Sequence, residues 1–265
     1  MREPENQPPI QVSDLRKGFG SQTVLNGINL TVAKGETVVL LGRSGTGKSV
    51  FLKLIVGLQK PDGGSIRIDG EEITGLDPRK LNRVRLKIGF LFQQAALYDS
   101  LTVEENVAFP LRRHSRMAAR EIRSRARELL ASVGLESDFG KLPSEISGGM
   151  QKRIGLARAL ALEPSILLFD EPTTGLDPIT AAEIGELILA LRRKRHVTSV
   201  VVTHDVAGAR AFADRMVLLD GGNIVTEGTF EQLQRSKDQF VARFLDGNPE
   251  ESKCRESFAW ESSSS

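Results

Sequence analysis

A phosphate-binding pattern lies in the first quarter of the chain. Positions 42 to 49 read Gly-Arg-Ser-Gly-Thr-Gly-Lys-Ser, which is a glycine, four residues and then Gly-Lys-Ser. Glycines let the backbone curl so that successive amides point at phosphate oxygens, and a following helix adds its positive end. In this pattern Lys48 reaches the β- and γ-phosphates, and Ser49 binds Mg²⁺. We expect a nucleoside triphosphate to be bound by Gly42, Arg43, Ser44, Gly45, Thr46, Gly47, Lys48, Ser49 and Val50.

A pair of acids follows an apolar run in the second half of the chain. Positions 166 to 171 read Ile-Leu-Leu-Phe-Asp-Glu. A buried strand here would bring Asp170 to its carboxyl end, where the sites of open α/β sheets lie. Asp170 would then support Mg²⁺ beside Ser49, and Glu171 would polarise the attacking water, as general base or as orienting group. Because the phosphate-binding pattern precedes the pair, we interpret it as functional rather than as a solvated turn.

A largely parallel sheet is needed to position these residues. Apolar runs of strand length alternate with helical patterns, which is typical of an α/β fold. A capping box at Thr102 and Glu105 and the helical patterns up to Pro164 predict a helical insert in this fold. Asp69-Gly70 predicts a type I′ hairpin turn. We expect strands over 36–41, 65–68, 88–92, 166–169, 198–202 and 216–219, and helices over 50–56, 117–133, 149–162 and from Asp177-Pro178 onward.

A further motif carries a family resemblance. Positions 146 to 151 read Ile-Ser-Gly-Gly-Met-Gln and resemble the signature motif of ABC-transporter ATPases, which the chain resembles over nearly its whole length. Met150 stands where most members have Gln. The resemblance implies a P-loop NTPase (RecA-like) core with an antiparallel β subdomain and an inserted α-helical subdomain. The expected parts are a core over 10–93 and 164–245, a helical subdomain over 94–163, a flexible N-terminus over 1–9 and a polar tail over 246–265.

The resemblance also implies roles for single residues. Phe19 corresponds to an aromatic that stacks on adenine, although a lone Phe is more often a core residue. Gln93 corresponds to a glutamine that senses Mg²⁺ and the attacking water, and His204 to a histidine at the γ-phosphate. Asp177 corresponds to an acid at a dimer seam, although helix capping alone would explain it. The implied catalytic residues are Lys48, Gln93, Glu171 and His204, and the implied metal ligands are Ser49, Gln93 and Asp170.

The signature motif implies a partner of the same kind. Ser147 and the amides of Gly148 and Gly149 would form an anion site at a helix N-terminus, which in the family closes on the γ-phosphate of the partner's ATP. With one phosphate loop and one signature motif in the chain, two copies would sandwich two ATP molecules, with Mg²⁺ as cofactor. The residues expected to act in trans are Ser147, Gly148, Gly149 and Asp177.

The resemblance and the composition together predict a location. ABC ATPases serve an integral membrane permease, and no stretch of about 18 apolar residues in this chain would cross a bilayer. The single cysteine, Cys254, favours a reducing compartment. A net charge of +2 is too mild to indicate a nucleic-acid partner. We expect a peripheral subunit on the cytoplasmic side of a bacterial inner membrane.

The cargo follows from a finer resemblance. The stretch from Phe92 to Leu111 is similar to the Mla/Mkl branch, whose ATPases serve lipid transporters. This implies phospholipid transport between inner and outer membranes, with a lipid-binding substrate protein in the complex. The alternatives are the ATPase of another importer, for example of amino acids, and a soluble ABC ATPase acting on ribosomes or DNA. A scaffold that binds ATP without turnover is opposed by Lys48, Asp170, Glu171 and His204.

Overall fold

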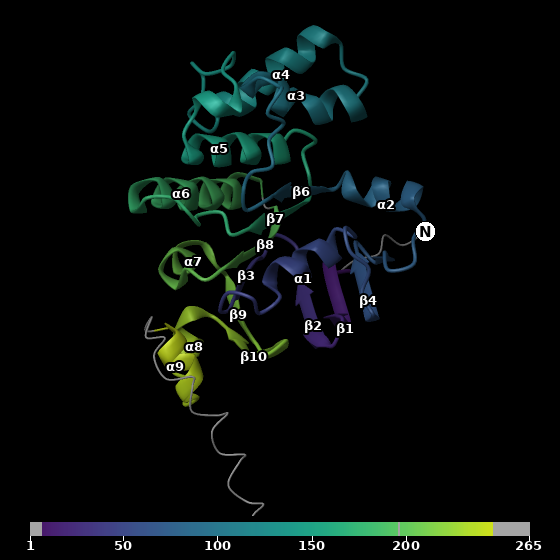
Figure 1. Ribbon diagram of the computed structural model, residues 1–265, viewed down its shortest axis with the longest axis vertical. Helices are drawn as coiled ribbons and strands as arrows, with labels where there is room; N and C mark the ends of the chain where they lie inside the picture. Colours follow the sequence, from purple (N-terminus) through teal and green to yellow (C-terminus); the bar gives the residue numbers. More distant parts are fainter. Residues whose placement is uncertain (1–6, 196, 246–265) are drawn as a thin grey trace, which may run out of the picture.

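A computed structural model describes residues 7–195 and 197–245 of the chain (Figure 1). The terminal stretches predicted to be flexible or polar therefore lie largely outside the described residues: of 1–9 only 7–9 are described, and 246–265 is not described. Within the described part, two sheets and two layers of helices are visible. The sheets have six and four strands.

The six-stranded sheet holds the chemistry-bearing loops. Its strand order is β10-β9-β3-β8-β7-β6, and every neighbouring pair except β10–β9 is parallel. The central strands are buried on both faces, which explains their unbroken apolar sequences. The five strands predicted for this sheet are present, with ends shifted slightly, whereas the edge strand β10 was not predicted. The strands are β3 (Thr37–Leu41), β6 (Ile88–Leu91), β7 (Ile166–Asp170), β8 (Thr198–Thr203), β9 (Arg215–Asp220) and β10 (Asn223–Gly228).

The second sheet is antiparallel and has the order β2-β1-β4-β5. The predicted hairpin at Asp69-Gly70 joins β4 to β5, and both turn residues have positive φ, at 47° and 78°, as a type I′ turn requires. The sequence patterns did not locate the two long strands β1 and β2, because register shifts interrupt their alternation of buried and exposed residues. The strands are β1 (Ile10–Phe19), β2 (Gln22–Val32), β4 (Gly63–Ile68) and β5 (Glu71–Glu72).

Three helices between β6 and β7 form the predicted insert, at the top of Figure 1. They are α3 (Val103–His114), α4 (Ala119–Ala131) and α5 (Gly148–Ala159), and they pack on one another. The predicted capping box starts α3: the Thr102 hydroxyl accepts from the Glu105 amide at 3.2 Å, and the Glu105 carboxylate accepts from the Thr102 amide at 3.0 Å.

Two helices of the insert are shorter than predicted. The helix predicted over 117–133 begins only at Ala119, because the Ala118 amide is capped by the Glu121 carboxylate at 2.7 Å. The helix predicted over 149–162 ends at Ala159. Glu163, which precedes a proline, has a φ of 53°, and a residue before proline is disfavoured in the helical region.

The remaining helices lie around the core. α1 (Lys48–Ile55) and α6 (Pro178–Arg195) follow the phosphate loop and β7, as predicted. Four short helices were not predicted: α2 (Pro78–Arg85), α7 (Val206–Phe212), α8 (Phe230–Gln234) and α9 (Gln239–Leu245). Among the described residues, no helix combines the length and the apolar character needed to cross a membrane.

The hydrophobic core has two parts, one on each face of the six-stranded sheet. In β3, Val38 and Leu40 pack into the cluster that contains α1 and the antiparallel sheet, whereas Val39 and Leu41 pack into the cluster that contains α3 to α6. This alternation follows from the two-residue period of a strand. The sheet is therefore covered by packed side chains on both faces. Its carboxyl edge supports the loops that follow β3, β7 and β8.

Candidate functional site

The phosphate loop connects β3 to α1. Gly45 and Gly47 have φ values of 83° and 96°, which a residue with a side chain rarely adopts. A Cβ on Gly42 would lie 2.6 Å from the Leu219 carbonyl oxygen and 2.8 Å from Thr46 Oγ1. Only glycine therefore allows the loop to approach β9 this closely. The loop leads directly into the N-terminus of α1, which favours a bound anion.

Lys48 is buried at the start of α1. Its Nζ donates to the carbonyl oxygens of Gly42 at 2.8 Å and Arg43 at 3.0 Å, and it lies 3.7 Å from Glu171 Oε1. Burial lowers the pKa of Lys48, and the nearby Glu171 and Asp170 carboxylates oppose this shift. The lysine is thus held inside the phosphate loop, next to the acid pair.

Ser49 and Asp170 form the predicted pair. The Ser49 hydroxyl donates to Asp170 Oδ1 at 2.6 Å, and Asp170 is the last residue of β7. Burial raises the pKa of Asp170, although the hydrogen bond from Ser49 opposes the shift. Two oxygen donors suit Mg²⁺, which usually keeps several waters and phosphate ligands. No cluster of three or more Asp, Glu, His or Cys residues that could hold a metal occurs in the described part of the chain, so phosphate and water would complete this site.

Glu171 is held by several side chains. It has a φ of 48°, and its amide donates to the Val202 carbonyl oxygen at 2.9 Å. Its Oε2 accepts hydrogen bonds from Thr174 Oγ1 at 2.7 Å and Thr203 Oγ1 at 3.3 Å, and lies 3.0 Å from His204 Nδ1. The loops after β7 and β8 thus fix the carboxylate. The His204 side chain is 52% exposed, so it can reach a ligand from the open side.

Lys152 was not among the residues predicted from the sequence. It lies on α5, is buried, and its Nζ donates to the main-chain carbonyl oxygen of Glu171 at 2.9 Å. Burial lowers the pKa of Lys152, against the attraction of the Glu171 and Asp170 carboxylates. A signal was present: Lys152 shares the face of Gly149 and Leu156, at helical spacing, and this face is buried.

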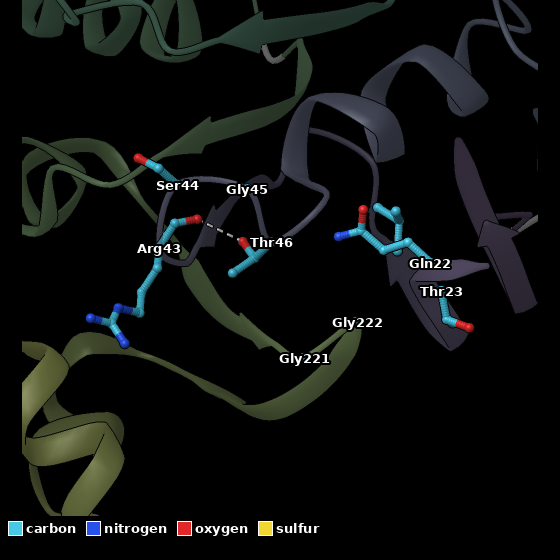
Figure 2. A pocket seen from close by; sticks show the side chains of 9 residues that line it. Gln22, Thr23, Arg43, Ser44, Gly45, Thr46, Gly221 and Gly222 are labelled. Carbon is cyan, nitrogen blue, oxygen red and sulfur yellow. Dashed lines mark hydrogen bonds between the residues drawn. The ribbon is translucent and has the colours of Figure 1, made fainter. Parts of the chain in front are cut away.

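A pocket of about 600 Å³ lies beside the phosphate loop (Figure 2). Its walls are the loop itself, the start of β2 and the turn between β9 and β10; the lining residues are Gln22, Thr23, Val24, Arg43, Ser44, Gly45, Thr46, Gly221 and Gly222. Phe19 pairs with Gln22 at the end of β1 and is 48% exposed, so it is not a core aromatic. Lys17 Nζ lies 5.2 Å from the centre of its ring. The pocket is placed to take the nucleoside end of a nucleotide whose phosphates occupy the loop.

The signature residues come together at the starts of α5 and α6. Ser147 caps α5, and its hydroxyl accepts from the Met150 amide at 3.3 Å. A Cβ on Gly149 would lie 2.4 Å from Thr180 Cγ2, whereas one on Gly148 would meet only Leu176 Cδ2, at 3.9 Å.

Asp177 lies next to these residues. Its carboxylate accepts from the amides of Ile179 at 3.1 Å and Thr180 at 3.0 Å, and from the Thr180 hydroxyl. The hydrogen bonds from Thr180, first the hydroxyl and then the amide, lower the pKa of Asp177. The capping role expected of Asp177 is therefore present, and the exposed Ile179 follows it.

Gln93 lies in the loop after β6, the strand beside β7. It is exposed. The next turn contains Ala95 and Ala96 with φ values of 56° and 50°. Arg158, from α5, donates to both of their carbonyl oxygens, at 2.6 and 2.8 Å. The loop of Gln93 is thus tied to the same helix as Glu171.

The chain resembles known ATP-binding proteins. Residues 25–174 match the family model described as ABC transporter. The chain is 46% identical over 238 residues to the probable ribonucleotide transport ATP-binding protein mkl of Mycobacterium tuberculosis, covering 90% of this chain and 66% of that protein. It is 41% identical over 242 residues to the intermembrane phospholipid transport system ATP-binding protein MlaF of Haemophilus influenzae, covering 91% of this chain and 92% of that protein.

Two further matches bear on fold and cargo. The chain is 42% identical over 221 residues to the methionine import ATP-binding protein MetN of Brucella abortus, covering 83% of this chain and 60% of that protein. A dimeric post-hydrolysis structure of the ATP-binding cassette MJ0796, bound to ADP and Pi, superposes with a TM-score of 0.78 at 38% identity, covering 83% of this chain and 98% of that one. The fold described above is that of an ABC ATPase cassette.

Proposed function

Since the chain belongs to the ABC transporter family and carries its ATP hydrolase domain, we propose that it is the ATP-hydrolysing subunit of a transporter that moves phospholipid between inner and outer membranes. The observation that carries the ATPase part is the cluster at the carboxyl edge of the sheet. There a buried lysine, a serine–aspartate pair and a glutamate held by two threonines and a histidine meet beside a glycine loop.

These residues have distinct tasks in hydrolysis. The loop amides and Lys48 hold the β- and γ-phosphates, where the lysine exchanges its carbonyl partners for phosphate oxygens. Ser49 and Asp170, with Gln93, would hold Mg²⁺, which would supply neutralisation of the phosphate charge when bound. Glu171 accepts a hydrogen bond from the attacking water and orients it. His204, at the open side of Glu171, contacts the γ-phosphate, and the exposed Phe19, which pairs with the pocket residue Gln22, stacks on the base.

The second half of the site belongs to a second copy of the chain. Ser147 and the amides of Gly148 and Gly149 close on the γ-phosphate bound in the partner, and Asp177 lies at the seam. The exposed Ile179 beside Asp177 is 75% accessible in the single chain, which is consistent with a surface that is covered in a dimer. In this proposal the helical subdomain over 94–163 contacts an integral membrane permease, and the core over 10–93 and 164–245 performs hydrolysis on the cytoplasmic face of the inner membrane.

The phospholipid part rests on the relatives and on the stretch from Phe92 to Leu111. The name of MlaF refers to phospholipid transport, and this relative is covered nearly end to end. The names of mkl and MetN refer to ribonucleotide and methionine transport, and the chain spans only 66% and 60% of their lengths. The second candidate is therefore the ATPase of a solute importer, which the match to MetN favours.

Recovery of the intact complex from native membranes tests the cargo. The tagged full chain is purified in mild detergent, and its protein partners and co-purified lipid are identified by mass spectrometry. We expect a multi-spanning permease, a lipid-binding protein and phospholipid in excess over a control preparation from untagged cells. A permease with a solute-binding protein instead would keep the ATPase assignment and overturn the lipid one. Recovery without any membrane partner would contradict the transporter proposal.

A further inference from the structure

Two cations of α5, the buried Lys152 and the partly buried Arg158, donate hydrogen bonds to main-chain carbonyls in the loops of the proposed active site. Lys152 donates to the carbonyl oxygen of Glu171, and Arg158 donates to those of Ala95 and Ala96 in the turn after Gln93. Both side chains therefore leave one helix and end on loops that follow two neighbouring strands, β7 and β6. The helix contacts the proposed site at two separate points.

Each of the three residues held in this way has an unusual backbone. Their φ values are 48° for Glu171, 56° for Ala95 and 50° for Ala96. A residue with a side chain pays a steric cost of about 1 kcal/mol or more in this left-handed region, so the surrounding contacts must stabilise it. For Glu171 those contacts are its own amide bonded to the Val202 carbonyl oxygen and its carbonyl oxygen bonded to Lys152.

The same helix begins at the signature motif. Ser147 caps α5, and Lys152 follows one and a half turns later on the buried face. If contact between Ser147 and a bound nucleotide moved α5, the Lys152 side chain would therefore transmit this movement to the main chain of Glu171. Burial of the Lys152 ammonium next to two carboxylates makes this contact costly to break, because the charge would lose its hydrogen-bond partner without gaining water.

We propose that Lys152 is a positioning residue: it fixes the main chain of Glu171 and links the signature helix to the water-orienting carboxylate of the same subunit. This inference rests on the proposed ATPase function and deepens it. It implies that α5, whose first residues would contact the nucleotide of the partner subunit, also sets the position of Glu171 in its own subunit. Lys152 does not contact substrate in this arrangement, since its Nζ is directed at the main chain of Glu171.

Steady-state ATP hydrolysis by the purified full chain tests the proposal. Lys152→Met keeps the length and apolar character of the stem but removes the donor. We expect kcat to fall by about 10- to 100-fold, the rate change that corresponds to losing one hydrogen bond from a charged donor. KM for ATP should change by less than about twofold. Lys152→Arg retains a cationic donor and is expected to keep at least roughly a third of the wild-type kcat. A wild-type kcat in Lys152→Met, or equal losses of kcat in both variants, would overturn the proposal.

A matched control removes a similar contact elsewhere. Arg85 donates to the carbonyl oxygens of Val56 at 3.0 Å and Gly57 at 2.7 Å, at the opposite end of α1 from Lys48. Arg85→Met should lower the melting temperature as much as Lys152→Met, or more, but leave kcat within about twofold of wild type. Equal losses of kcat in the two variants would mean that Lys152 acts only on general stability.

A double-mutant cycle shows whether Lys152 acts through Glu171. If it does, Lys152→Met should have almost no further effect on turnover once Glu171→Gln has removed the carboxylate, because residues that act as one unit are strongly non-additive. A double variant whose loss of turnover equals the product of the two single losses would contradict the inference. If Glu171→Gln itself turned over like wild type, the assignment of Glu171 would fail instead. If turnover were impaired in Glu171→Gln but normal in Lys152→Met, only the positioning role of Lys152 would be contradicted.

Discussion

At the scale of single residues, the two oxygens of the Glu171 carboxylate have different surroundings. Oε2 is bonded to Thr174 and Thr203 and lies close to His204, whereas Oε1 faces the Lys48 ammonium at 3.7 Å. A phosphate bound in the loop would draw Lys48 toward its oxygens and leave Oε1 free to accept a bond from water. The three partners on Oε2 would keep the carboxylate in place during this exchange.

The substitution Glu171→Gln tests this role. It keeps the size of the side chain and an acceptor oxygen but removes the negative charge. Turnover should fall by about 10² to 10⁴, the usual contribution of general acid–base catalysis, with ATP affinity nearly unchanged because Lys48 and Ser49 are intact. The measurement is phosphate release together with equilibrium binding of ATP. The control is Glu163→Gln, a glutamate paired with Arg125 on the surface, which should turn over normally; a normal rate in Glu171→Gln would remove its assigned role.

At the scale of elements, the close packing of α5 against α6 positions the signature motif. The contact depends on Gly149, where any side chain would collide with Thr180, and on Asp177, which both caps α6 and accepts from the Thr180 hydroxyl. The N-termini of both helices are thereby brought to one surface. Ser147, Gly148 and Ile179 are exposed on this surface.

Stability measurements on Gly149→Ala test this packing. The added Cβ would lie 2.4 Å from Thr180 Cγ2, so overpacking should lower the free energy of unfolding by about 1–3 kcal/mol. The higher helix propensity of alanine offsets up to about 1 kcal/mol of this loss. Adding Thr180→Ser removes Cγ2 but keeps the hydroxyl bonded to Asp177, and should recover at least half of the loss. Gly148→Ala, with its nearest contact at 3.9 Å, is the control and should not be destabilising in urea denaturation. A Gly149→Ala variant as stable as the control would contradict the packing argument.

At the scale of the whole molecule, the two groups of proposed site residues lie on different elements. Lys48, Ser49, Asp170 and Glu171 lie at the carboxyl edge of the six-stranded sheet, and Ser147 lies at the start of α5 in the helical insert. Lys152 joins the two groups through the main chain of Glu171. The solved cassette whose fold this chain shares is described as a dimer bound to ADP and Pi, and a head-to-tail pair would bring each Ser147 to the partner's phosphate loop.

Nucleotide-dependent dimerisation tests this arrangement. Glu171→Gln with Mg²⁺ and ATP should elute at twice the mass of the free chain by light scattering, because slow hydrolysis keeps the sandwich closed. Chelation of Mg²⁺ should return it to a monomer. Adding Ser147→Arg should prevent the dimer, since its bulk would fill the space for the partner's phosphate, while ATP still binds to each separate chain. A monomer under all conditions would refute the sandwich.

The sequence alone determined the features that depend on local order. The phosphate loop was predictable because its glycine spacing is a property of eight consecutive residues, and Asp170 and Glu171 because a buried parallel strand requires an unbroken apolar run before them. The capping box of α3 and the hairpin at Asp69-Gly70 were equally local, and the structure confirmed both. The roles of Phe19, Gln93, Ser147 and His204 came from the family resemblance and remain proposals.

Only the tertiary structure decided which distant residues meet. Thr203 and His204 reach Glu171 because β7 and β8 are neighbours in register. Lys152 reaches Glu171 because α5, the last helix of the insert, packs against α6 and β6. The helical spacing from Gly149 and Leu156 could place Lys152 on a buried face, but the sequence does not identify its partner, because that partner is a main-chain carbonyl with no side-chain signal. The strands β1 and β2 escaped prediction for a related reason: their register shifts are set by pairing with each other and with β4, and neither strand contains that information by itself.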